Sequence, residues 1–205
     1  MKKEYILGIL FFSAIWGTSE AFLGEALYNT GFPYPSVLLT IIGFSVLAFA
    51  SVSFPQRGTA TLIASLAMLY KFLNVPFFAC HLLGILMVGI CFDLFFNVFK
   101  IRNRSISAAA AIYLNYTAFA IMITYIFRYE YWVEGGISKI LSHIGISGTM
   151  AALGCAIFVP ISFYLAERIK SHSERPFNLQ YKLAPGSILV TTLGLWIYSI
   201  VVFGF

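Results

Sequence analysis

The chain has 205 residues, of which 60% are hydrophobic and only 10% are charged, and its mean hydropathy is +0.88. This composition excludes an ordinary soluble globular domain and indicates an integral membrane protein. The apolar tracts are continuous rather than alternating, which favours transmembrane helices over a transmembrane β-barrel. We therefore expect one all-α domain over residues 1–205, a polytopic helical bundle in the cell membrane, meaning a prokaryotic inner or plasma membrane.

Six or seven spans are expected along the chain, since each crossing needs about 20 apolar residues. In chain order they are Tyr5–Leu27, Ser36–Phe54, Thr59–Leu73, Phe77–Phe99, Ile106–Phe127, Ile146–Ala166 and Ser187–Phe203. The third is short, because Thr59 to Tyr70 covers only about 18 Å of helix. Pro76 then forces a turn that we expect to form one wall of a cavity.

The distribution of basic residues predicts the orientation of the bundle. If the N-terminus is cytoplasmic, only Lys71, Arg128 and Lys139 of the 13 Lys and Arg residues fall on the outer side. Such a bias towards the inner side favours this orientation, with the C-terminus outside if the seventh span is real. The net charge of +5 is then a topology signal and implies no nucleic-acid partner.

The outer connector Arg128–Gly145 is rich in aromatic residues, which are typical either of an interfacial belt or of a lid over an outward-facing site. Ile137, Ile140, Leu141 and Ile144 recur at helical spacing, so we expect a short helix lying on the membrane surface.

Glu20 is the most unusual residue of the first span, because a carboxylate at the centre of a membrane helix costs about 2.5–3.5 kcal/mol on insertion scales. Depth along each span places Lys71, Asn74 and His81 in the same outer half of the membrane. Opposite charges in a low-dielectric region favour each other, so we expect a Glu20–Lys71 pair or a polar cavity that both share.

We expect two faces of the first helix to have different roles. Trp16 lies one turn from Glu20 and is expected to form an apolar wall of the cavity, together with Tyr113 and Tyr116 of the fifth span. Asn115, between these tyrosines, needs a hydrogen-bond partner in apolar surroundings. Small residues at spacing four (Ser13, Gly17 and Ala21) lie about 100° away and would let another helix approach closely.

Other polar groups have structural explanations. Asp93 lies near the inner end of the fourth span, where we expect an ion pair with Arg57, Lys100 or Arg104. Cys80, Cys91 and Cys155 are expected to be buried thiols. His81 has no second His or Cys at metal-ligand spacing, so neither a metal nor a cofactor is expected, and no catalytic residue is assigned.

The small-residue ladder and the segment from Gly89 to Leu94, with Asp93 before Leu94, resemble features of the substrate-binding S components of energy-coupling factor transporters. The resemblance covers the first six spans. It implies that the ladder contacts a transmembrane coupling subunit, which works with ATPases, and that a vitamin or metal ion binds in an outward-opening cavity. The chain lacks the N-terminal histidine motif of the cobalt and nickel members, which argues against that branch.

The expected function is therefore that of a solute-binding subunit of an uptake transporter. A mixed Glu/Lys pocket suits a zwitterion or a small polar, vitamin-like molecule. The expected binding residues are Trp16, Glu20, Lys71, Asn74, His81, Tyr113 and Tyr116. Two alternatives stay open at this point: a membrane-embedded enzyme that acts on a lipid or lipid-linked substrate, and a structural subunit of a larger membrane complex.

Overall fold

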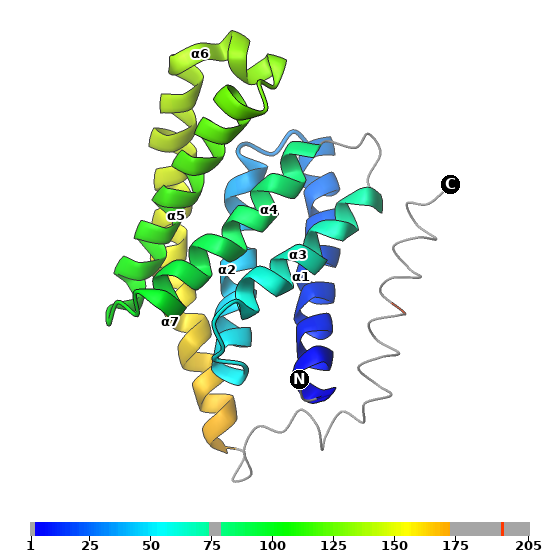
Figure 1. The fold of residues 1–205 in the computed structure, drawn as a ribbon, viewed down its shortest axis with the longest axis vertical. Helices are drawn as coiled ribbons and strands as arrows, with labels where there is room; N and C mark the ends of the chain where they lie inside the picture. Colours follow the sequence, from blue (N-terminus) through cyan, green and yellow to red (C-terminus); the bar gives the residue numbers. More distant parts are fainter. Residues whose placement is uncertain (1–2, 74–78, 173–193, 195–205) are drawn as a thin grey trace.

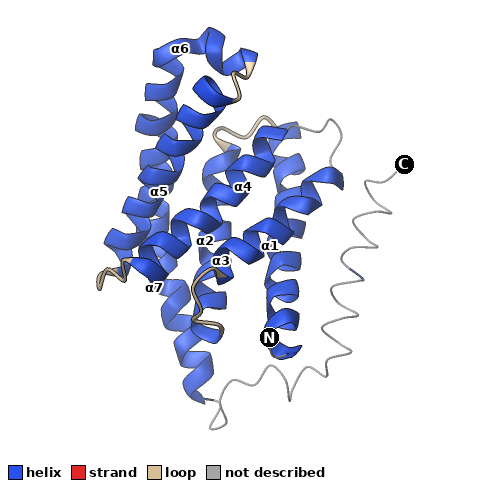
Figure 2. Cartoon of the chain, in the orientation of Figure 1, coloured by secondary structure: helices blue, strands red, loops and turns tan. Residues whose placement is uncertain are grey.

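The computed structural model describes residues 3–73, 79–172 and 194, and every regular element in this part of the chain is a helix (Figures 1 and 2). Five helices are long and apolar enough to cross a membrane, and a sixth apolar helix, Thr59–Phe72, is shorter. The expectations of an all-helical bundle and of a short third helix are confirmed. The proposed seventh span, apart from residue 194, lies outside the described residues.

The helices follow one another with short connections. Their bounds are α1 (Lys3–Asn29), α2 (Pro35–Ser53), α3 (Thr59–Ala67), η1 (Met68–Leu73), α4 (Ala79–Phe92), η2 (Asp93–Val98), α5 (Arg104–Ile121), η3 (Met122–Ile126), α6 (Glu130–Ser142), η4 (His143–Gly148) and α7 (Thr149–His172). Here η1 is a 3-10 helix that continues α3, whereas η2, η3 and η4 are wider π-helical segments.

Local sequence explains several of these boundaries. Pro35 begins α2, where its missing amide donor costs nothing. Gly58 precedes α3 with a φ of 84°, which glycine adopts without strain. The side chain of Asn103 accepts a hydrogen bond from the amide of Ile106 at 3.1 Å and so caps the N-terminus of α5.

Small residues let the helices pack closely. α7 packs against α2 and α5, α1 packs against α2 and α3, and α4 contacts α3 and α5 (Figure 1). At Gly89 of α4, an added Cβ atom would lie 2.8 Å from the backbone carbonyl oxygen of Ala60 in α3. Only glycine fits there, so the backbones of α3 and α4 approach directly.

A helix forms in Arg128–Gly145 as expected, but the expectation that it is a surface helix separate from the sixth span is wrong. α6, η4 and α7 form one helical run, Glu130–Ser171, instead of a surface helix followed by a separate span. The break within it is at Gly136, whose φ is 55°. Residues from Ile137 onward contain no proline until Pro160, so nothing in this stretch stops the helix from extending the sixth span.

The expected ion pair of Asp93 is also wrong. Its carboxylate accepts hydrogen bonds from the backbone amide and the hydroxyl of Thr61, both at 2.7 Å, and from the side chain of Asn97 at 2.6 Å. Arg104 pairs with Glu167 instead. Thr61 lies in the first turn of α3, where amide groups lack partners within the helix. Asp93 therefore caps α3 and fastens it to the end of α4.

This role makes the replacement Asp93→Leu destabilising. Leucine keeps the branching of aspartate at Cγ but accepts no hydrogen bond, so it leaves the amide and hydroxyl of Thr61 without an acceptor and the free energy of unfolding should fall by about 2 kcal/mol. Denaturant titration in detergent measures the loss. Glu167→Gln, at the exposed Arg104 pair, is the control and should cost less than about 1 kcal/mol. Equal small losses in both variants would contradict the capping role.

Candidate functional site

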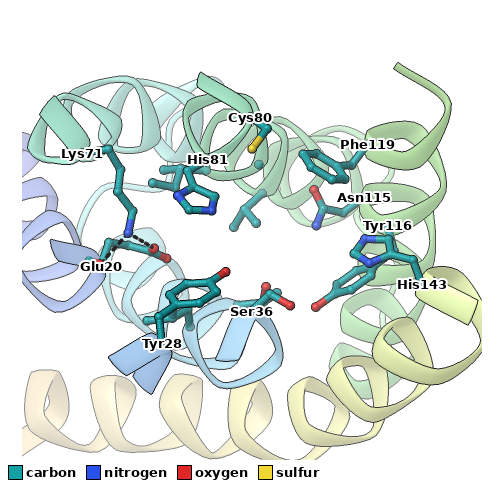
Figure 3. Close-up of a pocket in the computed structure, with 15 residues that line it drawn as sticks. Glu20, Tyr28, Ser36, Lys71, Cys80, His81, Asn115, Tyr116, Phe119 and His143 are labelled. Atoms are coloured by element: carbon teal, nitrogen blue, oxygen red, sulfur yellow. Dashed lines mark hydrogen bonds and ion pairs between the residues drawn. The ribbon is translucent and has the colours of Figure 1, made fainter. Parts of the chain in front are cut away.

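Glu20 and Lys71 form a buried ion pair between α1 and η1. The ammonium of Lys71 lies 3.5 Å from Oε2 of Glu20, and the two side chains are only 7% and 8% exposed. Lys71 also donates a hydrogen bond of 2.6 Å to the backbone carbonyl of Glu20 (Figure 3). The expected pair is confirmed.

Trp16 holds the second carboxylate oxygen of Glu20. Its indole N–H donates to Oε1 at 3.2 Å, and the ring is 1% exposed. The indole packs against Gly43 of α2, where an added Cβ atom would come within 2.7 Å of the ring. Trp16 thus lies behind the carboxylate and orients it, and it is not one of the residues that line the cavity described next.

A partly open cavity of about 110 Å³ lies in front of the ion pair. It is at the end of the bundle where α1 ends and where α2 and α4 begin. Its lining comes from six elements: Glu20, Tyr28, Ser36, Leu39, Thr40, Lys71, Cys80, His81, Gly84, Ile85, Val88, Asn115, Tyr116, Phe119 and His143.

Two histidine–tyrosine stacks form opposite walls of this cavity (Figure 3). The rings of Tyr28 and His81 have centroids 5.8 Å apart and are inclined by 25°. Those of Tyr116 and His143 have centroids 4.7 Å apart and are inclined by 30°. Trp132 meets the ring of His143 edge-on and supports it from behind. Aromatic rings thus fix the walls on both sides.

Asn115 brings an unsatisfied polar group to the cavity. Its side chain is 5% exposed, and its carbonyl oxygen has no hydrogen-bond partner in the described part of the chain. A buried amide oxygen without a donor costs about 1–3 kcal/mol. Because Asn115 lines the cavity, a molecule inside it can supply that donor.

The structure gathers some of the expected site residues and not others. Glu20, Lys71, His81 and Tyr116 line one cavity. Tyr113 does not: it is 40% exposed, and its hydroxyl pairs with that of Thr149 at 2.9 Å. Asn74 lies outside the described residues.

Sequence reasoning missed Tyr28, Ser36 and His143. The sequence predicts His143 within a surface helix, whereas the structure joins this helix to the sixth span and so brings His143 to the depth of the cavity.

The small-residue ladder packs inside the chain instead of forming an open docking face. Ser13 and Ala21 are 2% and 0% exposed, and a Cβ atom at Gly17 would collide with the ring of Tyr70. Ala21 and Tyr70 belong to one apolar cluster. The ladder does admit a close neighbour, as its spacing indicates, but that neighbour is the end of α3 and the start of η1.

A double-mutant cycle tests the ion pair. Lys71→Met leaves the Glu20 carboxylate buried without its cation and should cost about 3 kcal/mol of unfolding free energy. Glu20→Gln together with Lys71→Met removes both charges and should recover at least about 1 kcal/mol relative to the sum of the single losses. Denaturant titrations of the four proteins give the coupling. Strict additivity would show that the two charges do not interact.

Gly17→Ala tests the packing of the ladder. The new methyl group must displace the ring of Tyr70, so the isolated chain should lose about 1–2 kcal/mol of stability. Gly145→Ala is the matched control, because nothing lies within 4 Å of its added Cβ atom. It should be neutral or stabilising, since alanine favours helix over glycine by about 1 kcal/mol. Unchanged stability in both variants would return the ladder to the role of a docking face.

No protein-family model, curated protein or solved structure matches this chain. The functional argument is therefore built on the geometry of the cavity.

Proposed function

We propose that this chain is a membrane-embedded solute-binding protein that serves as the binding subunit of an uptake system. The observation that carries the proposal is the cavity in front of Glu20, where polar groups from six elements converge among aromatic walls. Small-molecule sites combine a mostly apolar lining with a few placed polar groups, which is the composition of this cavity.

The orientation of the bundle supports uptake from outside. With the N-terminus cytoplasmic, α1 ends at the outer side, and the cavity lies at that end. The bias of Lys and Arg towards the inner connectors favours this arrangement. The cavity then faces the medium from which a solute would be taken up.

An energising partner belongs to this proposal, in line with the resemblance to S components. A coupling subunit and its ATPases would supply the energy that a binding protein alone lacks. Since Tyr70 covers Gly17, the ladder of α1 is not proposed as the surface that meets such a partner. A partner would bind elsewhere on the bundle.

The variant Gly84→Leu tests the proposal by filling the cavity. Gly84 lines it, and an added Cβ atom would meet only the ring of Phe119, at an ordinary contact distance of 3.8 Å, so the side chain can start there without a clash. Wild-type protein incubated with a small-metabolite extract and washed should retain a solute detectable by mass spectrometry. Gly84→Leu should lose most of it, because the leucine side chain takes up about the cavity's whole volume.

Gly145→Leu is the control for this experiment, because Gly145 shares η4 with the lining residue His143 but does not line the cavity itself, and nothing lies within 4 Å of an added Cβ atom there. It should retain the same solute as the wild type. A set of retained molecules that is identical in all three proteins would sink the proposed function.

A further inference from the structure

The charges of the cavity cancel within the protein. Glu20 and Lys71 are the only carboxylate and the only ammonium among the described residues that line it. Both charged groups already have partners within the protein. The carboxylate of Glu20 pairs with Lys71 and accepts a hydrogen bond from Trp16, and the ammonium of Lys71 also donates a hydrogen bond to the backbone carbonyl of Glu20. An ionic ligand would have to take one partner from the other and leave a buried charge uncompensated.

The two imidazole rings do not change this balance. His81 and His143 stack on tyrosines at opposite walls, and Glu20, the one carboxylate of the lining, already faces Lys71. A positive charge on either ring would therefore have no free counter-charge among the described residues that line the cavity. The rings provide flat surfaces against which another flat ring can stack.

Size and shape restrict the ligand further. The cavity of about 110 Å³ is somewhat smaller than the ~150 Å³ engineered cavity that takes up benzene, and unlike that cavity it is partly open. Five of its lining residues have aromatic side chains: Tyr28, His81, Tyr116, Phe119 and His143. Aromatic rings associate best with other flat rings, in stacked or edge-on contact.

The carbonyl oxygen of Asn115 specifies one polar feature of the ligand. This oxygen is buried and has no donor among the described residues, and the residue that carries it lines the cavity. A ligand N–H directed at this oxygen would satisfy it. A site built around such a bond strongly discriminates against analogues without the donor.

We propose that the cavity binds an uncharged, flat molecule with a single ring and an N–H group that donates to Asn115. This inference rests on the proposed function and deepens it by naming the class of solute. It replaces the zwitterion that the Glu/Lys composition suggested, because the geometry pairs those two charges with each other.

Four probes of similar size separate charge from hydrogen bonding. Benzamide is neutral and carries N–H donors; acetophenone has the same shape without them; benzoate is an anion and benzylammonium a cation. Binding to the full chain in lipid nanodiscs, corrected with empty nanodiscs, should be tightest for benzamide. Acetophenone should bind about tenfold more weakly, as expected for one lost hydrogen bond, and both ions more weakly than benzamide.

Asn115→Leu is the matched variant. It should abolish the preference for benzamide over acetophenone while the binding of acetophenone persists, which a purely structural role of Asn115 would not produce. Gly84→Leu should weaken all binding. Retention of the benzamide preference in Asn115→Leu would overturn the role of Asn115.

The outcomes also separate this inference from the proposed function. Tighter binding of benzoate or benzylammonium than of benzamide, lost in Gly84→Leu, would overturn the neutral ligand and leave solute binding intact. Equal binding of every probe to wild type and Gly84→Leu would likewise overturn the ligand class. Solute binding itself would then be judged by the metabolite retained in the cavity-filling experiment.

Discussion

The buried Glu20–Lys71 pair is the interaction around which this end of the bundle is arranged. Two charges removed from water are tolerated only when their geometry is good and their remaining hydrogen-bonding capacity is used. Here the indole N–H of Trp16 donates a hydrogen bond to one carboxylate oxygen of Glu20, and the ammonium of Lys71 donates one to the backbone carbonyl of Glu20. The pair joins α1 to η1, so the charge balance of the cavity and the packing of the short third helix depend on the same contact.

Two glycines make room for the pair. Gly24 leaves space for the ammonium of Lys71, because an added Cβ atom would lie 3.1 Å from its Nζ. Gly43 admits the indole of Trp16 between α1 and α2. The cost of burying charge is thus offset by close helix approach, which in membranes depends on small residues. The remaining lining can then be aromatic and uncharged.

Depth along the helices could be predicted from the sequence, but rotation about them could not. Position within each span brought Glu20, Lys71 and His81 to one level, and the structure places them in one cavity. Tyr113 and Tyr116 have similar depths, yet only Tyr116 faces the cavity, because the rotation of α5 is set by its contacts with α4 and α7.

Trp16 was assigned to the correct face of α1, but its ring packs against Gly43 and therefore lies behind the carboxylate of Glu20 instead of lining the cavity. For Asp93 the sequence predicted a basic partner, whereas its carboxylate accepts a hydrogen bond from the backbone amide of Thr61 in the first turn of α3.

The position of Lys71 follows from how the third helix ends. A lysine near the end of a span ordinarily extends along the membrane normal until its ammonium reaches water. α3 is too short for that, and it is continued by the tighter 3-10 segment Met68–Leu73. Tyr70 packs on Gly17 in the same segment, which holds the backbone against α1. The ammonium is therefore directed sideways at Glu20, and Lys71 lines the partly open cavity, through which water can enter. A solute that fills the cavity excludes that water and strengthens the ion pair behind it, since charges attract more strongly as the local dielectric falls. Filling of the cavity and the strength of the ion pair that joins η1 to α1 are in this way physically linked.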